Sequence, residues 1–335
     1  GRITLLEDNV LIAPAPYSAP AAYYFPTMGR MAAVEVVKGP AAITQGPYTI
    51  GGALNMASTP IPRETGGTLL TEVGQDATYR VHATYGGRSD NGVGFLIEAH
   101  QWQSDGFQTI DRSGADTGLD VTDFTAKLSY APVGSPHAIE LKLQLADQDS
   151  NQSYLGLSDA DFGNDALRRY GLSELDNIAT EHEQAILRYS FDVTANLSVT
   201  ATAYNNTHQR NWFKTEGIDL DGSVNADSFS GSSWASVVDA VNLGKGLGNY
   251  THEELQGILD GNIDTAAGSV QLRSNNREYY SRGLQFGGIA PCVERRGTCC
   301  SRTNPHGRRC LCPCAGVPTA RPELQLPQIV HPSHH

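Results

Sequence analysis

The feature that most constrains the fold of this chain is a series of segments in which apolar residues alternate with polar ones. Residues 139–145 (IELKLQL) give the clearest case, because every second residue is aliphatic and the others are charged or polar. Similar segments lie at 81–85, 95–99, 124–130, 187–192 and 197–203. A period of two places one set of side chains on each face of a β-sheet. The sequence therefore predicts an all-β protein with about eight antiparallel strands between residues 68 and 286.

The connections between these segments alternate in length. Short turns are expected at 86–91, 131–136 and 193–196, and long loops at 104–120, 150–180 and 211–268. Short turns at one end and long loops at the other are typical of a transmembrane β-barrel. Tyr85, Tyr130 and Phe191 stand at the short-turn end, where aromatic residues anchor such barrels. A soluble sandwich or lectin-like protein is the alternative, but structureless loops this long are uncommon in compact soluble domains.

The composition and the spacing of polar residues exclude several functions. A formal net charge of -12 argues against a nucleic-acid partner, which needs a basic face. The acidic run from Asp159 to Asp165 lacks the glycine of a calcium loop, and Tyr170 stands where the loop's last glutamate belongs. No spacing typical of a metal centre, a nucleophile elbow, a P-loop or paired carboxylates occurs. We therefore expect no enzymatic activity, no catalytic residues, no metal and no cofactor.

Residues 31–60 contain the most specific motif in the chain. A strand at 33–37 leads into a Lys-Gly-Pro turn, a loop of small residues and a second turn, and a glycine pair then opens another strand at 53–57. Glycines permit backbone conformations that a side chain forbids, and prolines fix the turns. The motif residues are Lys38, Gly39, Pro40, Gly46, Gly51, Gly52 and Asn55. An ordinary hairpin of some other β protein is the alternative interpretation.

This order of elements resembles the plug signature of TonB-dependent outer-membrane receptors. The resemblance implies the C-terminal part of a plug domain at 1–65, followed by the N-terminal part of a transmembrane β-barrel at 66–288. Barrels of this family have twenty-two strands, so eight strands account for about a third of one. We therefore expect the chain to be an internal piece of a longer protein.

The N-terminal residues narrow the resemblance to receptors for ferric citrate and related iron chelates. Residues 2–12 predict a hairpin with an Asp-Asn turn, and a proline-rich loop follows at 13–20. In the receptors that it resembles, this loop reaches the apex of the plug and faces the ligand. The implied ligand contacts are Tyr17, Tyr23 and Tyr24, although these side chains could instead pack the plug against the wall. Ala19 and Ala21 replace polar residues of the ferric-citrate type, so the resemblance does not identify citrate as the chelate.

Three arginines complete the candidate ligand site. Arg168, Arg169 and Arg210 lie in or beside the predicted long loops, and a guanidinium fork matches a carboxylate. Solvated surface charges are the alternative. The resemblance implies uptake of a ferric chelate across the bacterial outer membrane. It also implies two partners, outer-membrane lipid and TonB. TonB is expected to bind an N-terminal segment that this chain lacks. A β-rich surface binding or adhesion protein without transport is the competing hypothesis.

The composition changes abruptly at residue 289. Residues 289–335 carry six Arg, seven Pro and four His but only two Glu, and they hold every cysteine of the chain. These cysteines are Cys292, Cys299, Cys300, Cys310, Cys312 and Cys314. Their spacing fits no standard zinc site. Translation out of frame is our preferred hypothesis, and a disordered basic tail or a real metal or disulfide module are the alternatives.

Overall fold

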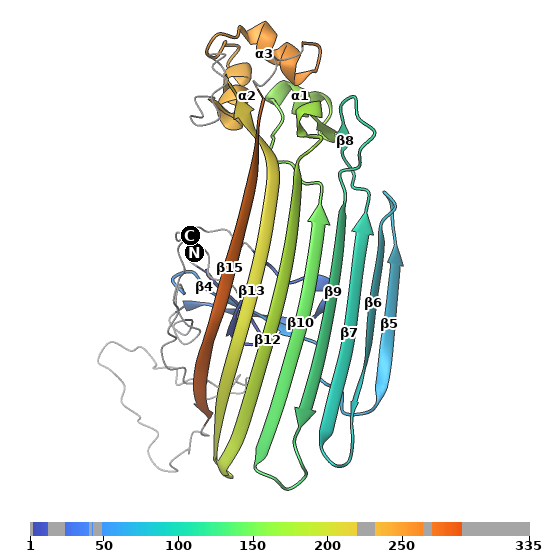
Figure 1. Cartoon of the computed structure of the whole chain (residues 1–335), viewed down its shortest axis with the longest axis vertical. Helices are drawn as coiled ribbons and strands as arrows, with labels where there is room; N and C mark the ends of the chain where they lie inside the picture. The colour runs from blue at the N-terminus through green and yellow to red at the C-terminus, as the bar shows by residue number, and fades with distance from the viewer. Residues whose placement is uncertain are drawn as a thin grey trace, which may run out of the picture.

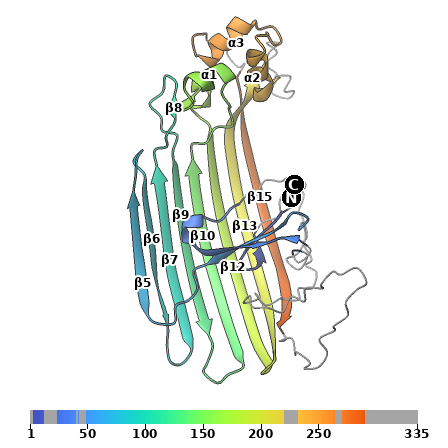
Figure 2. The ribbon, with the colours of Figure 1, turned by 180° about the vertical axis from the view of Figure 1, so that it is seen from behind.

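The computed structural model describes residues 3–12, 24–39, 42, 49–219, 232–263 and 270–289. A large antiparallel sheet of long strands forms a curved wall, and a small sheet lies against one face of it (Figures 1 and 2). We call the first sheet the wall, the face that carries the small sheet its inner face, and the small sheet with the segment 24–30 the plug. The expected tail beyond residue 289 lies outside the described residues.

The wall confirms the expected antiparallel meander. Each long strand pairs with the next one along the chain. The strands are β5 (Gly66–Val73), β6 (Tyr79–Arg88), β7 (Val93–Ser104), β9 (Leu119–Tyr130), β10 (His137–Ser150), β12 (Asn177–Thr194), β13 (Leu197–Ile218) and β15 (Val270–Ile289). The unequal connections are also confirmed, because the three expected short turns lie at one end of the wall and the three long loops at the other (Figure 1). A further short turn, between β5 and β6, lies at the end of the long loops.

Several strands are longer than the alternation predicts. β13 has 22 residues, although only 197–203 show a clear period of two. Beyond Ala203 polar residues such as Asn205, Asn206 and His208 occupy both faces, so the hydrophobic alternation ends. The backbone pairing nevertheless continues. The β12 and β15 registers run to Phe213 and Ile218 of β13. Backbone hydrogen bonds with neighbouring strands therefore extend the strand past the reach of the sequence pattern.

The outer face of the wall exposes a continuous apolar band. Along β10 it carries Ile139, Leu143 and Leu145, which are 42%, 48% and 56% exposed, and then changes to acidic Asp147. One row near the short turns consists of Val93, Tyr130, Ile139, Tyr189, Ala201 and Phe286 in register. Apolar surface this extensive marks a contact with membrane or protein. Among the described residues, no helix is long and apolar enough to cross a membrane.

The long connections fold into a cap at one end of the wall. It contains β8 (Thr109–Ile110), α1 (Asp159–Asn164), β11 (Arg168–Arg169), η4 (Gly171–Ser173), β14 (Ser232–Ser233), α2 (Trp234–Asn242) and α3 (His252–Leu259). The Thr-x-x-Glu spacing at 251–254 of the sequence predicts a capping box that opens a short helix, and α3 opens with this box between Thr251 and Glu254. Its apolar side chains meet those of α2 in a separate core that includes Trp234, Val237 and Leu255.

The motif predicts that the strands at 33–37 and 53–57 pair in one small sheet separate from the wall, and the plug confirms this. Its order is β2 (Val10–Leu11), β1 (Ile3–Glu7), β4 (Gly52–Ser58) and β3 (Met31–Val37), and the short helix η2 (Met28–Arg30) precedes β3. β3 and β4 pair antiparallel, with β3 at the edge of the sheet. Gly52 has φ +120°, and a Cβ there would lie 2.7 Å from the carbonyl oxygen of Val37. The motif therefore needs a glycine where its second strand opens.

The other described residues of the motif and of the N-terminal hairpin turn lie at the turns, within β4 or at the edge of this sheet. Asp8 and Asn9 form the hairpin turn with φ values of 51° and 64°. Asn55 accepts a hydrogen bond from the backbone N–H of Asn9 at 2.8 Å and donates one to Glu35 at 2.9 Å. It therefore ties the hairpin turn to the edge strand. Lys38 and Gly39 follow the end of β3 at the sheet edge, whereas Pro40 and Gly46 lie outside the described residues.

Candidate functional site

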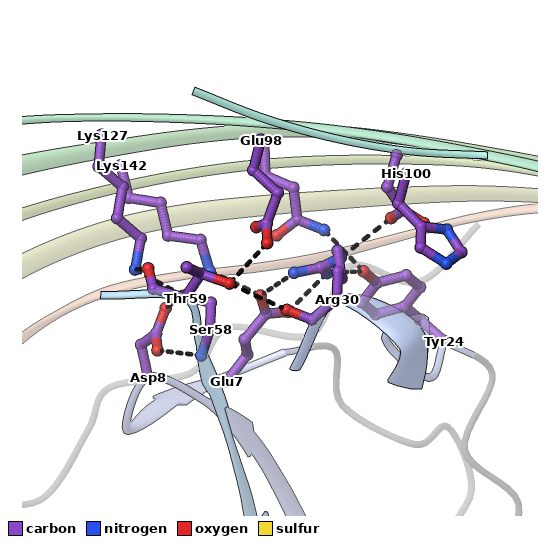
Figure 3. Close-up of polar contacts among 12 residues, drawn as sticks. Glu7, Asp8, Tyr24, Arg30, Ser58, Thr59, Glu98, His100, Lys127 and Lys142 are labelled. Carbon is purple, nitrogen blue, oxygen red and sulfur yellow. Dashed lines mark hydrogen bonds and ion pairs between the residues drawn. The ribbon is translucent and has the colours of Figure 1, made fainter. Parts of the chain in front are cut away.

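A buried ionic network joins the plug to the inner face of the wall, and Arg30 lies at its centre (Figure 3). The end of η2 places Arg30 beside Glu7 at the end of β1. Its Nη1 lies 2.8 Å from Glu7 Oε1, and its Nε lies 3.1 Å from Oδ1 of the wall residue Asp123. The three side chains are at most 1% exposed. A buried charge is tolerated only with partners of this kind, so these contacts fix the plug against the wall.

Two lysines of the wall extend the network. Lys142 on β10 places its Nζ 2.6 Å from Glu7 Oε1 and 2.7 Å from Asp8 Oδ2. Lys127 on β9 donates to Ser58 Oγ at 2.7 Å and to the carbonyl oxygen of Thr59 at 2.8 Å. The two lysines stand directly opposite each other in the strand register. Like charges in that position repel, and the plug carboxylates offset the repulsion.

A row of histidines on the wall also faces the plug. His82, His100, His182 and His208 share one row of the register on four strands. The ring of Tyr24 from the plug stacks on His182 with 3.5 Å between ring centroids. Aromatic stacking therefore holds the ring of Tyr24 against the wall.

The electrostatics of this interface keep the plug carboxylates ionised. Burial alone would raise the pKa of Glu7, but the charges of Lys142 and Arg30 outweigh burial and hold this pKa below its ordinary value. Burial likewise opposes ionisation of Asp8, and Lys142, Lys127 and the hydrogen bond from Ser58 lower the pKa of Asp8. Both groups thus stabilise the seated plug at neutral pH.

These lowered pKa values predict acid release of the plug. A carboxylate whose pKa is lowered by folding contributes its stabilisation fully above its ordinary pKa, which is about 4. The contribution is lost as the pH falls through the lower, folded-state pKa. We expect hydrogen exchange of residues 3–12 to stay slow from neutral pH to about pH 5 and, corrected for intrinsic rates, to accelerate below about pH 4. Glu7→Gln should weaken this acid dependence, and a midpoint near pH 6 would instead assign the release to the histidines.

The structure places Tyr24 inside the interface between plug and wall. It is 9% exposed, and its hydroxyl accepts a hydrogen bond from Arg30 Nη2 at 3.3 Å. The side-chain amide of Gln144 lies 3.0 Å from the same hydroxyl. Tyr24 therefore packs the plug against the wall, which is the second of its two predicted roles. Tyr17 and Tyr23 lie outside the described residues.

Arg168 joins three loops of the cap. Its guanidinium lies 2.9 Å from Asp111, 2.7 Å from Asp161 and 2.8 Å from Asp260, and each carboxylate comes from a different connection. Arg169 is buried and donates to the carbonyl oxygens of Asn151 and Ser173. The acceptors of both arginines thus come from the protein itself, and their role in ligand binding stays a prediction.

Arg210 alone of the three predicted arginines lies on the inner face of the wall. One register row contains Arg80, Trp102, Val121, Gln148, Thr180, Arg210 and Arg277. This row, which we call the cation row, is the next one beyond the histidines toward the cap. Arg80 lies 4.8 Å from the centre of the Trp102 ring, and Arg210 lies 5.7 Å from that of Trp212. The wall therefore presents guanidinium groups backed by aromatic rings just above the plug.

Most residues of the ionic network carry no local signal in the sequence. Glu7, Arg30, Lys127 and Lys142 were not among the expected site residues. One signal was present: Lys127 and Lys142 occupy the same phase of two adjacent alternating strands, so strand pairing brings them to the same face. Among the described residues, no group of three or more His, Cys, Asp or Glu side chains is arranged to hold a metal ion.

Comparison with solved structures identifies the same arrangement. The unliganded ferric citrate transporter FecA superposes with a TM-score of 0.56 and 19% identity over 86% of this chain. The siderophore receptor PiuA from Acinetobacter baumannii superposes with a TM-score of 0.59 and 14% identity over 86% of this chain. For the ferric-catecholate import receptor Fiu from E. coli K12, the TM-score is 0.56 and the identity 11% over 86% of this chain. This chain spans 36%, 35% and 39% of their respective lengths.

No family model matches the sequence. At such low identities the likeness establishes the fold. These structural neighbours are transport receptors, not enzymes. The chain therefore has the fold of a plug and an adjoining barrel wall found in TonB-dependent siderophore and ferric citrate receptors.

Proposed function

We propose that this chain belongs to an outer-membrane receptor that takes up an anionic ferric chelate. The observation that carries the proposal is the cation row, where Arg80, Arg210 and Arg277 lie on the inner face directly above a seated plug. Guanidinium groups beside aromatic rings suit a ligand that offers carboxylates or other oxygen anions. The cap above this row, built from three loops, is in a position to enclose such a ligand.

The proposal includes the surroundings of the receptor. The apolar band on the outer face would contact lipid, with the aromatic row near the short turns at the membrane interface. Residues 1–65 would be the later part of the plug and 66–288 the first part of the barrel. TonB would act through a plug segment that precedes this chain in the full-length protein. The chelate itself is not assigned.

Replacing the cations tests the proposed ligand site. In the full-length protein, Arg80→Gln and Arg210→Gln should each weaken binding of the transported chelate about tenfold, because each removes a charge-assisted contact. Binding can be followed by quenching of tryptophan fluorescence with a panel of ferric chelates that includes ferric citrate. Arg88→Gln is the matched control, since Arg88 has the same phase on β6 but lies at the short-turn end. Equal affinities for Arg210→Gln and Arg88→Gln would contradict the proposed site.

A further inference from the structure

Lys127 and Lys142 form a pair of buried cations whose direct partners, among the described residues, come from the plug. Glu140 and Glu98 of the wall act on Lys127 only through their charge. The two lysines are 7% and 2% exposed. The hydrogen bonds and ion pairs of Lys142 go to Glu7 and Asp8, and those of Lys127 go to Ser58 and Thr59. The wall therefore holds two adjacent ammonium groups whose direct partners would leave with the plug.

Stabilisation of the resting state alone does not require this arrangement. Well-packed apolar side chains usually replace a buried ion pair at no loss of stability. Two lysines directly opposite each other, moreover, destabilise the wall wherever the counter-charge is absent. The pair is therefore costly in the state in which the plug has moved, unless another anion takes the place of Glu7 and Asp8.

Inward side chains of three strands connect this pair to the cation row. Along β10, residues 148 and 142 are separated by 148 − 142 = 6 positions, or about 20 Å. The inward positions between the two levels on β10, β12 and β13 are Gln144, Ala146, His182, Gln184, Asn206 and His208. None of these residues is acidic, whereas the inward positions of β9 between the two levels include Asp123, which pairs with Arg30. On the next row toward the short turns, Arg188 stands opposite Glu140.

We propose that Lys127 and Lys142 form a second anion site, which Glu7 and Asp8 occupy while the plug is seated and an anionic ferric chelate occupies during passage. The proposal rests on the function proposed above. The plug carboxylates present to the two ammonium groups the same chemistry as the carboxylates of a chelate. When the plug moves, its carboxylates leave and the cations become available to the passing ligand.

Uptake kinetics separate this role from simple attachment of the plug. In cells that make the full-length protein, Lys127→Gln/Lys142→Gln should slow uptake of radioactive iron supplied as ferric citrate about tenfold at saturation. The dissociation constant at the outer site should stay within about twofold, because the plug covers both lysines there. Lys127→Arg/Lys142→Arg should restore uptake. Glu7→Gln is the control from the plug side, since it removes the ion pairs of Glu7 with Lys142 and Arg30 and leaves both lysines in place. Arg30 keeps its contact with Asp123, and uptake should not slow.

Equal slowing by Glu7→Gln and by the lysine variant would overturn the proposal, because the lysines would then serve only to hold the plug. Failure of the unaltered protein to bind or take up ferric citrate would count against citrate as the chelate, not against the anion site.

A second measurement covers that case without any transported chelate. In the full-length protein, acylation of Lys127 and Lys142 should be slow with the plug seated and fast in urea that releases the plug. Added citrate should then slow acylation of both lysines again, while an uncharged sugar should not. Acylation that is insensitive to citrate would overturn the proposal.

Discussion

Arg30→Met is expected to lower the free energy of unfolding of the plug by about 3–5 kcal/mol, because it leaves buried carboxylates without their cation. Glu7 would retain Lys142, but Asp123 would lose the guanidinium that now lies 3.1 Å away. Methionine fills much of the volume of the arginine stem, so the loss reports the charge rather than a cavity. Urea titration of the full-length protein, followed by hydrogen exchange of residues 3–12 and 31–37, measures the change.

The control for this experiment is an exposed ion pair between an arginine and a glutamate on the same face of the wall. Arg80 and Glu72 form an ion pair at 2.7 Å, but their side chains are 35% and 50% exposed. Solvent screens such a pair, and Arg80→Met should change the stability by at most about 1 kcal/mol. A loss for Arg30→Met no larger than that of Arg80→Met would show that the network does not hold the plug.

The alternation of apolar and polar residues predicted the wall well because the two faces of the sheet lie in different environments. On β10 the aliphatic residues Leu141, Leu143 and Leu145 face outward, and the sequence assigns them to one face without knowledge of any partner. What the alternation could not assign was the environment of the other face. Lys142 and Gln144 read as solvated side chains, yet both are at most 2% exposed because the plug covers them.

The ionic network was missed because its members are far apart in the sequence. Glu7 and Lys142 are separated by 135 residues, and Arg30 and Asp123 by 93. A single glutamate at the end of an apolar strand has no local signature of burial. Packing within the plug brings Arg30 to Glu7, and packing of the plug on the wall brings Lys142. Strand periodicity contains no information about either contact.

The cap shows the same limit in a different form. The capping box at Thr251 predicted the start of α3, since both of its bonds are local. α1 and α2 also start with serine caps, Ser158 and Ser233, but in runs that read as irregular loop. The apolar face of α2 meets that of α3 only in the folded cap, where Trp234 also donates to the carbonyl oxygen of Gly156, in the loop before α1, at 3.1 Å. The folding of the loops into one cap therefore depends on contacts between connections.

Arg168→Met tests whether these connections act as one body. The arginine is 20% exposed and pairs with Asp111, Asp161 and Asp260. Its removal leaves three carboxylates facing one another, and we expect a loss of about 2 kcal/mol in the stability of the cap. Local opening follows that free energy, so proteolysis of the loops should accelerate about thirtyfold when measured on intact cells.

The same variant decides between the two roles of Arg168. If Arg168 links the loops, its removal should affect proteolysis of all three connections together. Arg273→Met should not, because Arg273 is 53% exposed and, among the described residues, forms an ion pair with Glu216 alone. If Arg168 is a ligand contact, its removal should weaken chelate binding as strongly as Arg210→Gln does while leaving the loops resistant to protease. The geometry favours the link between loops, since carboxylates of the protein already bind the guanidinium from three sides. Protease resistance equal to that of the unaltered protein would contradict it.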